Sequence, residues 1–507
     1  MKTPTLIGAV AILVLCAGEA AGKPNKNSKK MKLPVLTLLY LIFCLFAPLG
    51  SVFSEERLNI VVFLSDDLGR LDTSIHGSVD ARTPTMDRLA ADGMVFENAY
   101  VASPSCCPNR YSFLTGLMPA RHGAHPNHTK PKEGTNYLTK ILKDMGYHVA
   151  SFGKVSHGRM QFPGGDHFSS QPEDMHENVI PYFDETEIEG PVCLLVGDRR
   201  PHVSWSEEST YDPEKVTLPS FLIDTPETRE HWARYLTDVT GMDAEMGRIY
   251  EFAKEKFGDN FIFLFTSDHG GQWPRGKWNL YDYGARVPMI VVWPGHIEPG
   301  TRTDAMTSWV DLLPTLIDAA GGDVPWDIDG KSFKPVLLGE SDQHRDKIFT
   351  THTGDAGMNI FPIRSVRIGK YKYIHNLCPD AYHTNHSDRH RKDGAGAYWD
   401  SWDAAAKQDP EAAGIVERYY TREEFEFFDL EKDPLELNNL GGNPEYAGKM
   451  EELKRELATW AEAQGDDLQP HREPYPVGEP IPVFENGGKA PKGKAKSKGR
   501  SKAKTNE

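Results

Sequence analysis

The chain has 507 residues, with 57 Lys and Arg against 73 Asp and Glu, so its formal net charge is −16. This acidic balance argues against a general affinity for nucleic acid, and an anionic substrate would have to meet cations gathered locally in a site. The length suffices for one large core and a smaller domain. Of the six cysteines, Cys16 and Cys44 lie in apolar N-terminal segments, which leaves too few for a multi-disulfide framework.

Two apolar runs, residues 6–16 and 33–49, precede the rest of the chain and are separated by a basic stretch. Met31 and Lys32 followed by the second run have the layout of a signal peptide, with a cleavage site near Ser54. We therefore expect residues 1–54 to be a targeting region, with translation starting at Met31, and the protein to be exported to a periplasmic, extracellular or lysosome-like compartment. The alternative is a membrane anchor, since a span needs roughly 18 to 20 apolar residues.

Continuous apolar runs rich in β-branched residues predict buried strands at residues 59–64, 149–152, 192–196, 261–266 and 289–292. Helical patterns lie between them. One begins at Thr83-Pro84 and stops at Gly93, a long one begins at Thr225-Pro226, and a third follows Asp311. This alternation predicts an α/β fold for residues 55–340, with a large mixed, mostly parallel sheet sandwiched by helices.

After about Gly339 the pattern changes to shorter strands at residues 363–368 and 371–375, a turn-rich segment that includes residues 426–430, and an amphipathic helix at residues 444–463. We expect a smaller C-terminal α+β domain at residues 341–467. Residues 468–507 are expected to be a disordered tail, basic from residue 487. The loop at residues 375–391 is rich in His and Arg, and is interpreted as an exposed loop or as a further contact for anionic groups.

Acidic residues follow two of the predicted strands. Asp66 and Asp67 come after residues 59–64, and Asp268 and His269 come after residues 261–266. Each pair alone is more typical of a turn. Together, three carboxylates at the carboxyl edge of one sheet would repel one another unless a cation lay among them. The sequence therefore predicts a divalent metal site here.

The segment from Cys106 to Gly116 combines a small nucleophile with a predicted helix start. Pro108 is typical of a first helical turn, which places Cys106 at or just before the helix N-terminus. That end carries free N–H groups and partial positive charge, and Arg110 adds a permanent cation. A buried structural cysteine is the competing interpretation.

The pattern Cys106-x-Pro108-x-Arg110, followed by Leu-Thr-Gly, resembles the signature of the formylglycine-dependent sulfatases, which have an alkaline-phosphatase-like fold. The resemblance implies that a formylglycine-generating enzyme oxidises Cys106 to 3-oxoalanine (formylglycine), whose hydrate is the nucleophile. Asn109 departs from the Ser or Ala that is usual there. The resemblance also implies one bound metal ion per chain, Ca²⁺ first and Mg²⁺ or Mn²⁺ as options, held by Asp66, Asp67, Cys106, Asp268 and His269.

The same resemblance supplies roles for the cations that follow predicted strands. It implies that Lys154, Lys277 and Arg110 neutralise the sulfate oxygens. His202 would protonate the leaving atom, and His157 would accept a proton from the nucleophilic group as sulfate departs.

A longer resemblance, from residue 59 to about residue 460, is to the heparan N-sulfatases (sulfamidases), and it makes N-sulfoglucosamine of heparan-like chains the first choice of substrate. The Lys-x-x-His spacing of Lys154 and His157 is similar instead to iduronate sulfatases, and Arg199 stands where sulfamidases usually have His. An O-sulfatase (iduronate-2-sulfatase-like or arylsulfatase-like) therefore remains an alternative. Alternatives of other classes are a phosphodiesterase or phosphatase of the same fold and a non-catalytic glycan-binding protein. The oligomeric state is open, with a homodimer as one option, and sequons at Asn127 and Asn385 matter only in a glycosylating host.

Overall fold

The computed structural model describes residues 57–157, 163–170, 175–391 and 394–481, and these contain an eight-stranded sheet with strand order β4-β3-β5-β1-β6-β7-β2-β8. The pairs β6–β7 and β7–β2 are antiparallel and the other neighbours are parallel, which confirms the predicted mixed, mostly parallel sheet. The strands are β1 (Asn59–Ser65), β2 (Met94–Tyr100), β3 (His148–Gly153), β4 (His167–Ser169), β5 (Val192–Gly197), β6 (Phe261–Ser267), β7 (Met289–Val292) and β8 (Thr301–Ser308).

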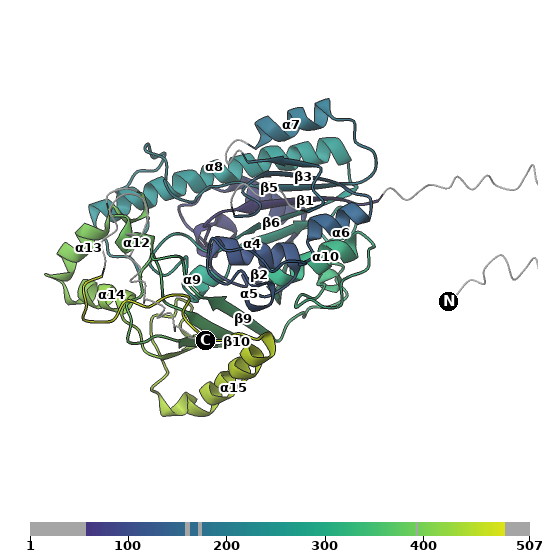
Figure 1. The fold of residues 1–507 in the computed structure, drawn as a ribbon. Coiled ribbons are helices and arrows are strands. Elements are labelled where there is room, and N and C mark those ends of the chain that lie inside the picture. Colours follow the sequence, from purple (N-terminus) through teal and green to yellow (C-terminus); the bar gives the residue numbers. More distant parts are fainter. Residues whose placement is uncertain (1–56, 158–162, 171–174, 392–393, 482–507) are drawn as a thin grey trace, which may run out of the picture. The chain divides into compact units, whose positions relative to one another are not determined.

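Helices cover both faces of this sheet (Figure 1). On one face, Val61 and Phe63 of β1 belong to a core that includes α3 (Pro84–Asp92), α7 (His176–Glu185) and α8 (Pro226–Phe257). On the other face, Ile60 and Val62 belong to a core with α4 (Cys106–Thr115), α6 (Leu138–Asp144) and α10 (Leu312–Ala319). Because both faces are buried, residues 60–64 of β1 are all apolar, and the sequence therefore shows this strand as a continuous apolar run.

The long helix α8 begins where the sequence predicted. The hydroxyl of Thr225 accepts a hydrogen bond from the backbone N–H of Thr228 at 3.1 Å, and Pro226 is the first helical residue. Pro needs no N–H partner in the first turn, and the Thr225 cap satisfies one of the free donors that remain. One side of the helix is buried against the sheet through residues such as Tyr235, Val239 and Met246.

A second, antiparallel sheet has the order β12-β11-β10-β9, which confirms the expected smaller α+β part. Its strands are β9 (Lys347–His352), β10 (Ile363–Ile368), β11 (Tyr371–Asn376) and β12 (Phe425–Asp429). Helix α15 (Ala447–Gln464) packs Leu453 and Leu457 on it. The segment at 426–430 was interpreted as turn-rich, and this was wrong for residues 426–429, because each of them pairs with a residue of β11. Both sheets belong to one compact unit that starts at Arg57, and a division near residue 340 stays a prediction.

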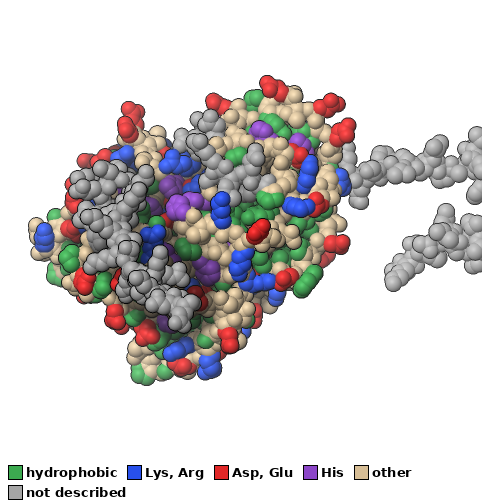
Figure 2. Space-filling model, viewed as in Figure 1, with side chains coloured by type: hydrophobic (Ala, Val, Ile, Leu, Met, Phe, Trp, Pro, Cys, Tyr) green, Lys and Arg blue, Asp and Glu red, His purple; other side chains and the backbone are tan. Residues whose placement is uncertain are grey.

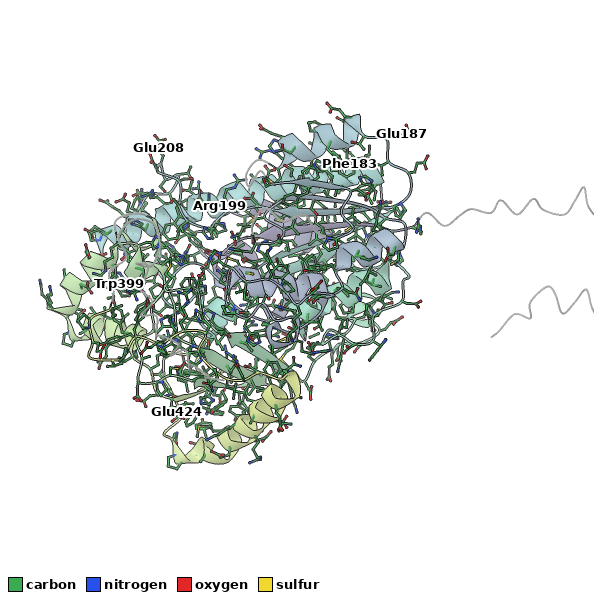
Figure 3. All side chains as sticks on the ribbon, viewed as in Figure 1. Phe183, Glu187, Arg199, Glu208, Trp399 and Glu424 are labelled. Atoms are coloured by element: carbon green, nitrogen blue, oxygen red, sulfur yellow. The ribbon has the colours of Figure 1, made fainter. Side chains whose placement is uncertain are left out.

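Several elements were not predicted. Helices α13 (Trp399–Ala406) and α14 (Pro410–Tyr420) lie beside the start of α8, where Trp399, labelled in Figure 3, is fully buried and Trp402 donates its indole N–H to the Thr228 hydroxyl at 2.8 Å. The loop at 375–391 is not simply exposed, since His383 and Asn385 are buried in it. The remaining short helices are α5 (Pro119–His122), α9 (Asp282–Ala285), α11 (Lys334–Leu337), α12 (His386–Arg389), η1 (Arg70–Asp72), η2 (Ser74–His76), η3 (Trp309–Asp311), η4 (Gly394–Gly396) and η5 (Pro444–Tyr446).

The structure describes only part of the two ends of the chain. The predicted targeting region, its cleavage site near Ser54 and the basic tail from residue 487 lie outside the described residues. Residues 468–481 were expected to be disordered, and this was wrong: Tyr475 donates its hydroxyl to the Gly357 carbonyl at 2.5 Å, and His471 Nδ1 lies 3.1 Å from the Thr353 carbonyl oxygen. Within the described part of the chain, every helix is too short or too polar to span a bilayer.

Candidate active site

Three carboxylates meet at the carboxyl edge of the two central strands. Strands β1 and β6 are parallel neighbours, with Ser65 opposite Ser267. Asp66 and Asp67 directly follow β1, and Asp268 directly follows β6, so the strand register brings the three side chains to one place. All three are fully buried, and the backbone N–H of Asp67 donates to Asp268 Oδ1 at 3.1 Å.

Cys106 faces these carboxylates from the first turn of α4, with Ser105 as the N-cap residue, as the sequence predicted. Its Sγ lies 3.3 Å from His269 Nε2 and 3.7 Å from Asp66 Oδ1. One ligand atom from each member of a five-residue group lies within 4.8 Å of all the others, and these residues are Asp66, Asp67, Cys106, Asp268 and His269.

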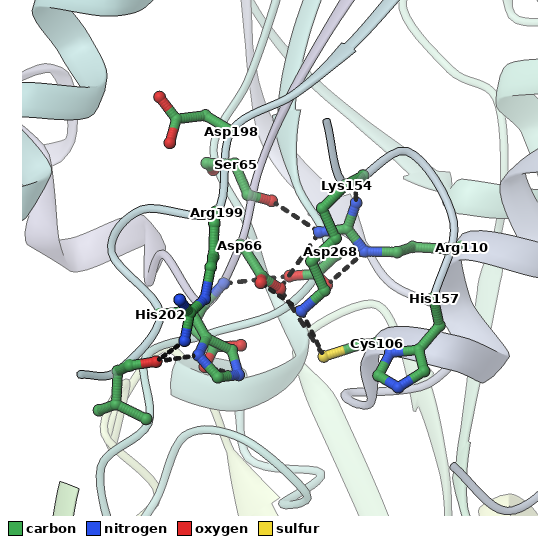
Figure 4. A network of polar contacts seen from close by, with 12 residues as sticks. Ser65, Asp66, Cys106, Arg110, Lys154, His157, Asp198, Arg199, His202 and Asp268 are labelled. Atoms are coloured by element: carbon green, nitrogen blue, oxygen red, sulfur yellow. Dashed lines mark hydrogen bonds and ion pairs between the residues drawn. The ribbon is translucent and has the colours of Figure 1, made fainter. Parts of the chain in front are cut away.

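Two lysines border the same cluster. Lys154 follows β3, forms an ion pair with Asp66, and places its Nζ 3.6 Å from Cys106 Sγ. Lys277 lies 3.0 Å from each carboxylate oxygen of Asp67 and is almost fully buried. The structure therefore brings both predicted lysines to the carboxylates, and Lys154 also to Cys106, as Figure 4 shows.

Arg110 lies one helical turn after Cys106 and is fully buried. Its Nε donates to Asp268 Oδ2 at 2.9 Å, its Nη2 lies 3.2 Å from Asp66 Oδ1, and its Nη1 donates to the Lys154 carbonyl. Each nitrogen of the guanidinium thus bonds to a protein oxygen. In this arrangement Arg110 orients the carboxylates, whereas the sequence resemblance implied that it contacts sulfate.

Two histidines flank the cluster on different sides (Figure 4). His202 follows β5; its Nδ1 lies 2.5 Å from the Val203 carbonyl oxygen, which requires a proton on Nδ1, and its Nε2 lies 3.8 Å from Asp67 Oδ2. The imidazole of His157 lies next to Cys106. Histidine side chains also reach the surface on the face drawn in Figure 2.

The charges around Cys106 change its acidity. Burial alone would raise the pKa of the thiol, but Lys154 and Lys277 lower that pKa well below its ordinary value. A thiolate is the reactive form of cysteine. Burial lowers the pKa of His202 to about 4 against the opposing effect of Asp67, so its imidazole is neutral near neutral pH.

The pKa values of two of the carboxylates shift in opposite directions. Burial would raise the pKa of Asp66, but Lys154, His202 and Arg110 hold it well below its ordinary value. Burial raises the pKa of Asp268 to about 8 even though Arg110 opposes the shift. Asp268 therefore keeps a proton to higher pH than Asp66, and a bound cation would favour the ionised form of Asp268.

Comparison with known families identifies the family of the chain. The family model described as "Sulfatase" matches residues 58–322, more than half of the chain. The chain belongs to the sulfatase family. A second model, "N-sulphoglucosamine sulphohydrolase, C-terminal", matches residues 272–390. This sulfatase is accordingly a sulfuric ester hydrolase, and its predicted family and enzyme class are confirmed.

Individual relatives are distant. An ulvan-active sulfatase from Formosa agariphila is 27% identical over 494 residues, covering 93% of this chain and 90% of that protein. Human N-sulphoglucosamine sulphohydrolase is 25% identical over 456 residues, covering 79% of this chain and 89% of that protein. Among solved structures, BT4656 in complex with its substrate D-glucosamine-2-N,6-O-disulfate is 21% identical, covers 81% of this chain and 99% of its own, and has a TM-score of 0.62. The phosphonate monoester hydrolase of Agrobacterium radiobacter is 19% identical, covers 80% of this chain and 96% of its own, and has a TM-score of 0.63.

The donor set of this sulfatase fits the divalent metal that the family generally uses. Three buried carboxylates offer the oxygen ligands that hard cations prefer, and His269 adds one nitrogen. Cys106 Sγ marks the place where an oxygen of the hydrated formylglycine would lie after modification. The identity of the ion, with Ca²⁺ as first choice, stays a prediction.

Some residues around the site were not assigned from the sequence. Asn109 is fully buried; its Oδ1 accepts from the Ala102 N–H at 2.9 Å and its Nδ2 donates to the Asp268 carbonyl at 2.6 Å, so it ties α4 to the end of β6. The two sequon asparagines are also buried, Asn127 at 5% and Asn385 at 1% exposure. No spacing in the sequence signals that loops hold these side chains inside.

Proposed function

We propose that this sulfatase removes sulfate from a sulfated glycan with a nucleophile made from Cys106, and that its first substrate class is N-sulfoglucosamine in heparan-like chains. The observation that carries the proposal is the buried Cys106, within 3.7 Å of Asp66 and His269 and within 3.6 Å of Lys154 Nζ. A non-catalytic glycan-binding protein has no need to bury a low-pKa cysteine among metal-binding carboxylates.

Each side chain of the site has a proposed task. A formylglycine hydrate at position 106 and a divalent ion on the carboxylates would supply an acidified hydroxyl nucleophile and an easy route for expelling sulfate. Lys154 and Lys277 border Cys106 and Asp67, where they can neutralise the charge on sulfate oxygens. The neutral ring of His202 carries its proton on Nδ1, so Nε2 can act as the acid for the leaving atom only after it gains a second proton. His157 lies where it can accept a proton from the group at position 106.

The preference for an N-sulfate is supported by the match of residues 272–390 to the C-terminal model of N-sulphoglucosamine sulphohydrolases and by the similarity to the human enzyme of that name. An O-sulfatase is the second candidate, because the ulvan-active sulfatase matches over more of the chain. Arg199 Nη2 donates to the same Val203 carbonyl that His202 contacts, at 2.8 Å, and so places a permanent cation beside His202. That cation would suit an acidic substituent on the substrate.

Mass spectrometry and a sulfate-release assay test the proposal together. After co-expression with a formylglycine-generating enzyme, the peptide containing Cys106 is expected to carry the aldehyde. Release of sulfate from N-sulfoglucosamine is then compared with release from 2-O-sulfoiduronate and an aryl sulfate, and with hydrolysis of a phosphodiester, which the phosphodiesterase alternative requires. We expect N-sulfoglucosamine to be the fastest substrate.

The matched control is Cys106→Ala, which removes the nucleophile without adding bulk. It is expected to abolish turnover, because no other described side chain occupies the nucleophile position. Sulfate release surviving at about one tenth of the parent rate would contradict the assignment. A faster rate on an O-sulfate would leave the sulfatase chemistry in place and reject the N-sulfate preference.

A further inference from the structure

His157 makes a close contact that leads away from the metal cluster. Its Nε2 lies 2.6 Å from Nδ1 of His128, and the two ring centroids are 4.3 Å apart with planes at 75°. The other nitrogen of His157, Nδ1, is buried without a hydrogen-bond partner among the described residues, and the ring lies beside Cys106 (Figure 4). His157 therefore connects Cys106 to His128.

His128 in turn reaches a buried carboxylate. Its Nε2 lies 3.5 Å from Asp355 Oδ1, and the side chain of Asp355 is only 7% exposed. The backbone of His128 has φ = 61°, in the left-handed region that residues other than Gly seldom adopt. Such a conformation persists when surrounding contacts hold it, and these often belong to functional sites.

Asp355 is itself held in place from both sides. Its second oxygen, Oδ2, accepts from Asn127 Nδ2 at 2.7 Å, and Asn127 Oδ1 accepts from the backbone N–H of Cys107 at 3.0 Å. The backbone N–H of Asn127 donates to the Gly354 carbonyl at 2.9 Å. Burial would raise the pKa of Asp355, but His128 and Asn127 lower it, so this carboxylate is ionised at neutral pH. A loop that follows β9 is thereby fixed to the residue next to the nucleophile.

The hydrogens along this chain can be placed by elimination. An ionised Asp355 only accepts, so His128 Nε2 carries a proton that it directs at the carboxylate. Asp355 raises the pKa of His128 above its ordinary value. Above that pKa His128 is neutral, and its other nitrogen, Nδ1, has a free lone pair that accepts the Nε2 proton of His157. This leaves a lone pair on His157 Nδ1, the nitrogen beside Cys106. The carboxylate thus determines which nitrogen of His157 can accept a proton.

We propose that His128 and Asp355 are positioning residues, which hold the His157 ring in the orientation and tautomer that present an unprotonated Nδ1 to the group at position 106. The inference deepens the proposed function, on which it rests, and assigns part of the site to the loop after β9. A carboxylate that orients a histidine through its far nitrogen is a general device of enzyme sites, and loss of such a partner typically costs roughly 10- to 100-fold in activity.

Nitrogen NMR of the protein labelled with ¹⁵N-histidine tests the tautomer directly. The resonances of His157 are found among the 19 histidines as those missing from His157→Ala. In the parent protein we expect its Nδ1 to show the shift of an unprotonated nitrogen and Nε2 that of a protonated one. Asp355→Asn and His128→Ala are expected to average or reverse this pattern. A His157 pattern unchanged in both variants overturns the proposal.

Kinetics provide the second readout. His128→Ala is expected to lower kcat roughly 10- to 100-fold with little change in KM, because the substrate still binds. The His128 side chain is 58% exposed, so imidazole added to the buffer can enter the space that the variant leaves and should restore part of kcat. A residue with a purely structural role would not be rescued in this way, and absence of rescue in a folded variant counts against the proposal.

A matched control is available at His176, whose Nδ1 lies 2.8 Å from the buried carboxylate of Glu245 at the start of α7. His176→Gln removes a similar histidine–carboxylate contact, and we expect kcat and the His157 resonances to stay at parent values. If the parent protein releases no sulfate from any substrate, the proposed function fails. The NMR comparison still decides the positioning role in that case.

Discussion

At the scale of single residues, the site has an equal number of buried acidic and basic side chains before any metal binds. Asp66 pairs with Lys154, Asp67 with Lys277, and Asp268 with Arg110. Buried charges are costly unless they are paired, and these pairs limit the cost in the metal-free protein. The fold should consequently depend on the metal much less than the chemistry does.

We therefore expect dialysis against a chelator to abolish sulfate release while leaving the protein folded. The circular dichroism spectrum should keep its native shape. The free energy of unfolding should fall only by the contribution of ion binding, which is about 2.7 kcal/mol at a free-ion concentration one hundred times Kd. Adding Ca²⁺ back should restore the rate. Unfolding at room temperature on chelation would show that the lysines do not balance the carboxylates.

At the scale of elements, one buried carboxylate connects η1 with α8 and α9 behind the site. Asp72 Oδ2 accepts the hydroxyl of Tyr235 at 2.7 Å and that of Tyr283 at 2.9 Å. Burial raises the pKa of Asp72 to about 6, and the two tyrosine hydrogen bonds only partly oppose this. Between about pH 4 and pH 6, the folded protein therefore holds a proton at Asp72 that the unfolded chain has lost.

The sign of the effect follows from that proton. Because the folded state binds more protons in this window, the free energy of unfolding falls as pH rises, by about 3 kcal/mol for Asp72 alone. Asp72→Asn keeps the shape and the acceptor oxygen but does not titrate. Urea unfolding at about pH 4 and about pH 8 should show the variant gaining about 3 kcal/mol relative to the parent across the interval. If the free energy of unfolding changed equally with pH in the two proteins, this account would be rejected.

At the scale of the whole molecule, a buried lysine joins the small sheet to the end of the large one. Lys372 on β11 is 2% exposed and lies 2.8 Å from Asp282, the first residue of α9, and 2.9 Å from Glu436, which follows β12. Burial raises the pKa of Glu436 to about 7, against the opposing effect of Lys372. Lys372 is the cation that these two acidic side chains share.

Lys372→Met is therefore expected to destabilise the protein by about 3 kcal/mol, because it leaves the buried Glu436 without its cation, while Asp282 keeps Arg286 and Arg367 at 3.5 and 3.7 Å. Lys370→Met is the matched control on the same hairpin, since Lys370 is 33% exposed and pairs with the exposed Glu431 and with Asp429, a buried carboxylate that Lys432 also approaches at 3.8 Å. Its cost should stay below about 1 kcal/mol. Urea unfolding measures the free energy of unfolding of both variants. Equal losses in the two would mean that burial of Lys372 and its partners does not matter for stability.

The sequence predicted the centre of the molecule better than its margins. Strands β1, β3, β5, β6 and β7 lie within one residue of the predicted runs, because central strands are apolar on both faces. Strands β2 and β8 were not predicted. Glu97 and Asn98 interrupt the apolar run of β2, and β8 lies at the edge of the sheet with alternate residues exposed.

In the site too, residues in segments with a clear sequence pattern could be predicted, and residues without one could not. Its cysteine, carboxylates and lysines follow predicted strands or a recognisable motif, so their positions could be anticipated. His128 and Asp355 lie in loops 227 positions apart in the sequence and carry no pattern of their own, which means that only the three-dimensional structure brings them together. Arg110 was correctly placed, but its partners depend on geometry that the motif does not encode.

The burial of Asn127 has a practical consequence for producing the enzyme. Its amide holds both Asp355 and the backbone of Cys107, and an oligosaccharide on that nitrogen would have no room in the folded chain. Asn385 is equally enclosed. A eukaryotic secretory host that decorates either acceptor before folding would yield misassembled material, so cytoplasmic or periplasmic bacterial expression is the safer source of active protein.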